Sequence, residues 1–152
     1  MVFRHFGQAD YKALAPHMRA LALARGDLFL VGADTRLAQN VSADGVHLPE
    51  RLAHTLPRLR KRYPGWWLST SAHSLSALYQ AQQWGADFVF LSSVLSSDSP
   101  SAGRAIGLTR ACTWARRVSV PVYALGGVDA HTPLPSAFAG YAGISCWKDE
   151  GT

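Results

Sequence analysis

Two glycines in the last third of the chain stand where backbone groups could bind an anion. Gly126 and Gly127 directly follow residues 120–125, an apolar run with the composition of a buried strand. Because glycine has no side chain, successive backbone N–H groups can converge on a phosphate there. A Gly-Gly pair is also a common way to end a strand in a turn. The pair by itself leaves both interpretations open.

Three basic or titratable side chains are further candidates for chemistry. Arg4 falls within the short apolar stretch 2–6, and an unpaired buried charge is costly, so Arg4 either points to an open end of the sheet or pairs with a carboxylate. His47 alternates within a predicted strand and His73 begins a predicted helix. Both histidines are therefore interpreted as structural, with acid–base catalysis as the alternative.

Strands and helices that could position these residues alternate along the whole chain. Short apolar runs predict strands at residues 2–6, 28–31, 45–48, 67–71, 88–91, 120–125 and 141–145. Amphipathic stretches predict helices at residues 10–25, 35–40, 50–63 and 74–84, one ending at 116, and a weak one at 133–138. The first helix either kinks at Pro16 or begins near Ala15, with Leu14, Met18 and Leu21 on one face.

Seven such strands predict an α/β fold with a parallel sheet, because each crossover must lay a helix over it. A doubly wound sheet and a barrel both satisfy this pattern. An eight-stranded barrel needs about 200 residues or more, and this chain has 152. The barrel alternative is therefore a shortened single domain, residues 1–152, that lacks the first strand. Its open edge beside residues 2–6 would be covered by an upstream segment or a second copy of the chain.

The composition indicates which classes of partner suit the protein. No apolar run of about 18 residues and no leader with a long apolar core occurs, which predicts a cytoplasmic protein without a membrane partner. The net charge of +5 suits an anionic ligand, a nucleic acid or a solvated basic surface. Residues 58–63, with the sequence RLRKRY before Trp66 and Trp67, mix cations with aromatic rings. The cations also suit the C-terminal end of a helix, and this interpretation is preferred to nucleic-acid binding.

Four segments resemble one enzyme family. They read ADGVHL at 43–48, SAHS at 71–74, GADFV at 85–89 and PVYALGGV at 121–128. In this order and spacing they are similar to signatures of the thiamine phosphate synthase/TenI family. The resemblance implies a TIM barrel, and on that ground the barrel is preferred to the open sheet. It also implies a role in thiamine biosynthesis, where the synthase joins a pyrimidine diphosphate to a thiazole phosphate with the help of magnesium.

The resemblance implies that part of the phosphate-binding site is retained. Ser71 matches a serine that contacts the diphosphate, and Arg4 is the one survivor of a Gln-x-Arg-x-Lys pattern whose other positions hold Val2 and Phe6. Arg4 and Ser71 are therefore candidates for a second anion contact. The backbone sites implied for the thiazole phosphate fall on Gly126, Gly127, Gly143, Ile144 and Ser145.

Most of the catalytic positions implied by the family are lost. The two carboxylates that hold magnesium fall on Ala33 and Leu52, and a diphosphate-binding lysine falls on Pro100. Asp34 or Glu50, one or two residues away, could substitute only if the geometry suited magnesium. The tautomerase histidine of TenI proteins falls on Ser93. No catalytic residue or metal ligand is therefore assigned, and magnesium is expected only if synthase activity is retained.

Two functions remain at this point. The first is a thiamine phosphate synthase/TenI-like protein that binds a phosphorylated small molecule at a degenerate synthase site. The second is an active synthase whose missing groups come from an upstream segment or a partner chain.

Overall fold

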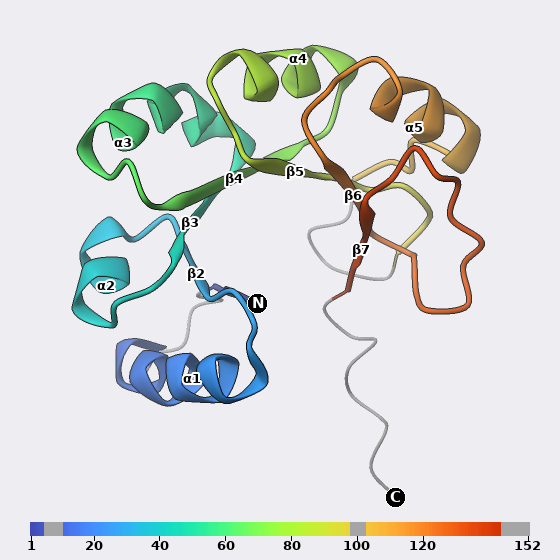
Figure 1. The fold of residues 1–152 in the computed structure, drawn as a ribbon. Helices are drawn as coiled ribbons and strands as arrows, with labels where there is room; N and C mark the ends of the chain where they lie inside the picture. The colour runs from blue at the N-terminus through green and yellow to red at the C-terminus, as the bar shows by residue number, and fades with distance from the viewer. Residues whose placement is uncertain (5–10, 98–102, 144–152) are drawn as a thin grey trace, which may run out of the picture.

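The described residues contain seven strands in one parallel sheet that curls into an open barrel, with the helices on its convex side (Figure 1). The computed structural model describes residues 1–4, 11–97 and 103–143. The strands follow one another in sequence order from β1 to β7, and each neighbouring pair is parallel. Within the described residues, β1 and β7 are the edges of the sheet. The predicted α/β barrel, shortened and open, is confirmed.

The element bounds follow the sequence patterns closely. The strands are β1 (Val2–Phe3), β2 (Leu30–Gly32), β3 (Gly45–Leu48), β4 (Trp67–Ala72), β5 (Phe88–Leu91), β6 (Val122–Leu125) and β7 (Gly140–Ala142). The helices are α1 (Tyr11–Arg25), α2 (Thr35–Asn40), the 3-10 helix η1 (Glu50–Thr55), α3 (Leu56–Arg62), α4 (Leu75–Gln83) and α5 (Leu108–Ala115). No helix in the described part of the chain is long and apolar enough to cross a membrane.

Helix α1 has the bounds of the longer of its two predicted alternatives and differs in part in its buried face. The helix continues through Pro16 from Tyr11. The face expected to pack carried Leu14 and Leu21, but these side chains are 47% and 45% exposed. The buried side chains are Tyr11, Ala15 and Ala22. Of the predicted face, Met18 packs against the core, whereas Leu14 and Leu21 do not, because the small alanines lie against the sheet.

The last crossover also differs from its prediction. Residues 133–138 form turns and not a helix, so β6 and β7 are joined by irregular chain. Pro133 and Pro135 lie in this stretch, and proline removes the N–H donors that a helix needs. The final strand ends at Ala142, earlier than predicted. The predicted residues Ile144 and Ser145 lie outside the described part of the chain, as does Phe6 at the end of the first predicted strand.

Alternation along each strand divides the sheet into two faces. The outward side chains are apolar and pack under the helices, as Leu68, Val89 and Ala124 do. Inward side chains on neighbouring strands lie at the same height because the strands are in register: Gly32 pairs with His47, His47 with Ser69, and Ser69 with Phe88. One step nearer the C-terminal ends, Ser71 pairs with Phe90 and Phe90 with Tyr123. The inner face is therefore polar on β3 and β4 and aromatic on β5 and β6.

Two aspartates at the N-terminal ends of strands hold this register. The Asp44 carboxylate accepts hydrogen bonds from the Phe29 backbone N–H at 2.7 Å and from the Arg19 guanidinium of α1 at 3.1 Å. Asp87 repeats the arrangement, accepting from the Leu68 N–H at 2.6 Å and from Arg60 of α3 at 2.7 Å. Each carboxylate thus joins its own strand to the preceding strand and to the helix before that strand. Hydrogen bonds to ionised groups are stronger than neutral ones.

The close approach of β3 to β4 at Gly45 gives a testable prediction. A Cβ atom at Gly45 would overlap the Trp67 carbonyl oxygen, so the strands must separate if any side chain is added. We expect Gly45→Ala to lower the free energy of unfolding by about 3 kcal/mol, the upper end of typical overpacking costs. Gly65→Ala is the matched control, because nothing lies within 4 Å of its added Cβ. Urea denaturation of both variants measures the difference, and equal midpoints would contradict the packing argument.

Candidate anion site at the C-terminal ends of the strands

All seven strands run in one direction, so the residues that follow them gather at one end of the open barrel. In barrels of this kind the functional residues lie at that end. Arg4 follows β1, Ala33 follows β2, His73 follows β4, and Gly126 and Gly127 follow β6. The structure therefore brings the residues singled out in the sequence to one rim of the molecule.

A hydrogen-bonded cluster centred on His47 lies on the inner face below this rim. The Nδ1 atom of His47 lies 3.0 Å from Ser69 Oγ, and its Nε2 atom lies 3.1 Å from Ser71 Oγ. His47 is 3% exposed and Ser69 is fully buried. The Phe90 ring packs edge-on against the imidazole, with 5.3 Å between ring centroids. Both ring nitrogens and the ring plane of His47 are thus held in place.

The environment of His47 opposes a positive charge. Burial, with a smaller contribution from the cationic Arg4, lowers the pKa of His47 to about 3. Arg4 is exposed at the end of β1, and its effect on His47 places its charge near the cluster. The orientation of Arg4 toward the mouth of the barrel stays a prediction. His47 is therefore neutral at ordinary pH and acts as a hydrogen-bonding group.

Gly126 and Gly127 have a packing role that the sequence did not reveal. Both have positive φ, +90° and +66°, a conformation that favours glycine. A Cβ atom on Gly126 would lie 2.9 Å from Ser93 Oγ, and one on Gly127 would overlap the Ser96 carbonyl oxygen. The Gly126 carbonyl accepts a hydrogen bond from the Leu95 N–H at 2.9 Å. The glycines therefore hold the loop after β5, and phosphate binding by Gly126, Gly127 and Gly143 stays a prediction.

The two carboxylates considered as substitute metal ligands make contacts within the fold. Asp34 caps α2 by accepting from the Leu37 N–H at 2.9 Å, and its other oxygen lies 3.8 Å from Lys12 Nζ. One Glu50 oxygen accepts from the His73 N–H at 2.8 Å and lies 2.6 Å from His73 Nδ1. Among the described residues, no three His, Cys, Asp or Glu side chains form a group that could hold a metal ion.

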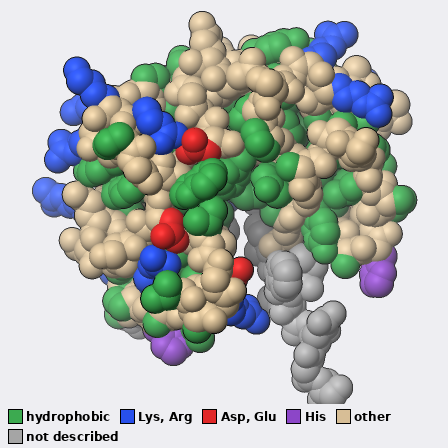
Figure 2. Space-filling view, in the orientation of Figure 1, with side chains coloured by type: hydrophobic (Ala, Val, Ile, Leu, Met, Phe, Trp, Pro, Cys, Tyr) green, Lys and Arg blue, Asp and Glu red, His purple; other side chains and the backbone are tan. Residues whose placement is uncertain are grey.

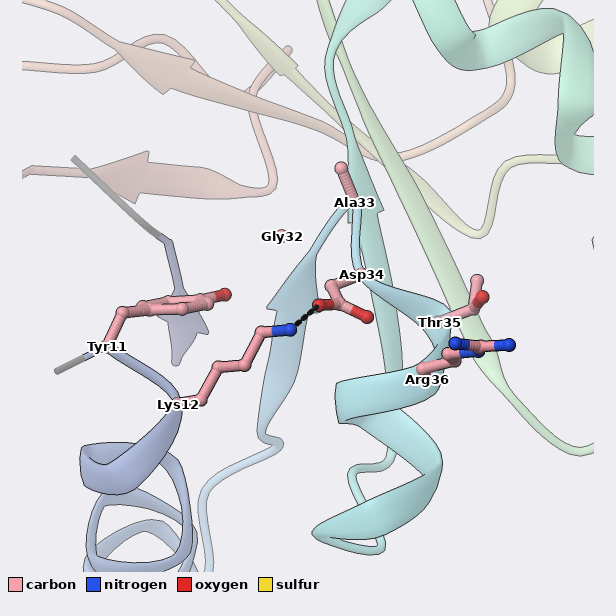
Figure 3. A pocket seen from close by; sticks show the side chains of 7 residues that line it. All are labelled: Tyr11, Lys12, Gly32, Ala33, Asp34, Thr35 and Arg36. Atoms are coloured by element: carbon pink, nitrogen blue, oxygen red, sulfur yellow. Dashed lines mark ion pairs between the residues drawn. The ribbon is translucent and has the colours of Figure 1, made fainter. Parts of the chain in front are cut away.

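A pocket of about 530 Å³ lies beside the end of β2. Figure 3 shows its lining, with Lys12 at the start of α1 pointing across the pocket toward Asp34. Ala33 in this wall has a φ of +57°, where aspartate and asparagine are several-fold enriched among non-glycine residues. The backbone at Ala33 thus has a conformation that aspartate and asparagine adopt more readily than alanine.

Two arginines of the basic stretch in α3 make contacts within the fold. Arg60 donates to Asp87 and, at 2.7 Å, to the Trp66 carbonyl, and the Arg62 guanidinium lies 5.5 Å above the centre of the Tyr63 ring. Figure 2 shows Lys and Arg side chains on the outside of the curl, over the region of α3 in Figure 1. Arg60, Lys61 and Arg62 all lie in the last turn of α3, where cations are favourable to the helix dipole.

A family model described as thiamine monophosphate synthase matches residues 3–148. The chain belongs to the thiamine monophosphate synthase family. A protein of Aquifex aeolicus (strain VF5), provisionally named thiamine-phosphate synthase 2, is 39% identical over 116 residues, which are 76% of this chain and 61% of the relative. The thiamine-phosphate synthase of Methanoculleus marisnigri (strain ATCC 35101 / DSM 1498 / JR1) is 32% identical over 140 residues, 90% of this chain and 65% of that protein.

A solved member of the thiamine monophosphate synthase family has the same fold. The thiamine phosphate pyrophosphorylase of Pyrococcus furiosus superposes with a TM-score of 0.71 at 26% identity, over 84% of this chain and 62% of that structure. The chain thus spans about three fifths of the length of these family members. The resemblance found in the four sequence segments is confirmed at the level of family and fold.

The buried state of His47 gives a prediction for stability against pH. The unfolded chain binds a proton at His47 near pH 6.5, whereas the folded pKa is about 3. Its contribution to stability is therefore present above pH 6.5 and is lost as the pH falls toward 3. His47→Gln cannot titrate, so we expect the stability difference between wild type and variant to change by up to about 1.4 kcal/mol per pH unit in this window.

Urea denaturation at pH 7, 6, 5 and 4 measures this difference. Parallel stability profiles for wild type and His47→Gln would show that another group controls the acid unfolding.

Proposed function

We propose that this member of the thiamine monophosphate synthase family binds a phosphorylated small molecule at the C-terminal ends of its strands, at a degenerate synthase site. The observation that carries the proposal is the Arg4, His47 and Ser71 arrangement. It combines one exposed cation with a hydroxyl held by a buried neutral histidine. A guanidinium and a hydroxyl are both suitable donors to phosphate oxygens.

Reduced synthase chemistry follows from the groups that are missing. Diphosphate departure needs cations and a metal to stabilise the developing negative charge. The positions implied for the magnesium carboxylates hold Ala33 and Leu52. The neighbouring Asp34 and Glu50 are engaged with Leu37, Lys12 and His73, so a change of partners would have to precede metal binding.

An active synthase completed by an additional segment or a partner chain is the second candidate. Within the described residues β1 and β7 are the edges of the sheet, which favours this candidate, because an exposed parallel edge offers backbone donors and acceptors to another strand. The lengths of the family members also support this candidate, because the matched part of the chain covers 61% of the Aquifex relative. Such an addition would supply both a strand and further side chains to the rim.

Anion binding is tested with two variants that remove the same charge. We expect Arg4→Gln to weaken binding of inorganic diphosphate by about tenfold or more, since a charge-assisted hydrogen bond contributes about 1.5–3 kcal/mol. Arg62→Gln is the matched control, because it removes one cation from the outer helix, where Arg62 contacts Tyr63. Calorimetric titration of wild type and both variants gives the affinities.

Equal losses in the two variants would assign binding to the general basic charge and not to this site. Gly127 is unsuitable for this test, because a side chain there would displace the loop at Ser96 and disturb the fold.

Synthase activity is tested directly. With pyrimidine diphosphate, thiazole phosphate and magnesium, we expect the purified chain to form thiamine phosphate at least 100-fold more slowly than an ordinary synthase, because loss of one charge-stabilising group commonly costs about 10²–10³ in rate. A rate near that of ordinary enzymes would contradict the degenerate site and favour the second candidate in the form where the partner is a second copy of this chain.

A further inference from the structure

The hydrogens of the inner-face cluster can be placed in two ways, and their placement decides whether Ser71 can donate a hydrogen bond to an anion. A neutral imidazole has one N–H donor and one acceptor nitrogen. His47 contacts Ser69 Oγ through Nδ1 and Ser71 Oγ through Nε2. Two arrangements of the hydrogens therefore satisfy the same heavy-atom positions.

The first arrangement places the proton on Nδ1. His47 then donates to Ser69 Oγ, and Nε2 accepts the only hydroxyl hydrogen of Ser71. Ser71 keeps acceptor lone pairs but has no hydrogen left to donate. A phosphate oxygen beside Ser71 would face lone pairs and be repelled.

The second arrangement places the proton on Nε2. Ser69 then donates its hydroxyl hydrogen to Nδ1, and His47 donates from Nε2 to Ser71 Oγ. The Ser71 hydroxyl hydrogen is free to bind an anion. The whole chain of donors, from Ser69 through His47 to Ser71, then points toward the rim where Arg4 lies.

We infer that His47 is a positioning residue for the anion site, which in its Nε2–H tautomer donates to Ser71 and so frees the Ser71 hydroxyl to donate to a phosphate group. The inference rests on the function proposed above, since it requires an anion at Ser71. Ser69 takes part without touching the ligand, because its hydroxyl is the donor that Nδ1 needs in this tautomer. An anion at Ser71 therefore selects the tautomer.

The test is nitrogen-15 NMR of the full chain with labelled histidine, recorded with and without inorganic diphosphate. The two-bond correlations of an imidazole distinguish the Nε2–H tautomer, the Nδ1–H tautomer and the imidazolium. The chain has six histidines, and the signals missing from His47→Gln identify those of His47. We expect the Nε2–H pattern for His47 in the diphosphate-bound protein.

Four variants test whether the tautomer of His47 affects the binding of diphosphate. Ser71→Ala should abolish the effect of diphosphate on the His47 signals. His47→Leu should weaken diphosphate binding about three- to tenfold, the effect of one hydrogen bond, and His47→Gln, which keeps an amide donor, should weaken it less. Thr70→Val is the matched control, because its hydroxyl contacts two backbone carbonyls, that of Leu48 at 3.0 Å and that of Ser71 at 3.3 Å, and none of the side chains of the cluster. It should leave the His47 signals and the affinity unchanged.

The outcomes separate this inference from the function on which it rests. Diphosphate binding with His47 as the Nδ1–H tautomer or the imidazolium overturns the positioning role and leaves the anion site standing. Binding that is equally strong in wild type and His47→Leu does the same. Calorimetry that detects no diphosphate binding by wild type overturns both.

Discussion

The register between parallel strands is the constraint on which the rest of the structure depends, and two carboxylates hold it. Asp44 and Asp87 each accept the N–H of the preceding strand and a guanidinium from the helix before that strand. Their own N–H groups return bonds to Phe29 and Leu68. A slip of one residue would move every outward apolar side chain to the inner face. These charged anchors therefore set which side chains meet at each height of the barrel.

The polar cluster of the inner face follows from that register. His47 pairs with Ser69 across β3 and β4, and Ser71 lies two residues further along β4, on the same face. One imidazole can therefore reach both hydroxyls. The buried polar atoms satisfy one another, which offsets the cost of removing them from water. The same burial disfavours the imidazolium, so the cluster is neutral, and Arg4 is a charged group that acts on it.

The sequence predicted the fold well where a local pattern was sufficient. The bounds of β3, β5 and α2 agree with the predictions, because an apolar run or a capping aspartate such as Asp34 marks each of them. The face of α1 was predicted for Met18 but not for Leu14 and Leu21, since periodicity does not show that the small Ala15 and Ala22 lie against the sheet. Residues 133–138 were predicted as a weak helix from their apolar residues. They form turns because Pro133 and Pro135 lack the N–H donors that a helix needs.

The candidate site was predictable only in part. Family resemblance singled out Ser71 and the two glycines, but no local pattern shows that Gly127 packs against Ser96. The role of His47 depends on partners 22 and 24 residues away in sequence. The one local signal was the spacing of Ser69 and Ser71, which places two hydroxyls on one face of a strand. Their link to His47 needs the register of the folded sheet.

The fixed geometry of His47 explains how the cluster could respond to a ligand without moving. The two serines hold the ring nitrogens at 3.0 and 3.1 Å, and Phe90 packs edge-on against the ring. A change of tautomer moves hydrogens and leaves every heavy atom in place, so the packing of the core is unchanged. The cost of reorganisation on binding is then small, as in other sites where hydrogen-bond donors are oriented in advance. Under the proposed function, such a site would bind an anion with donors that are already oriented.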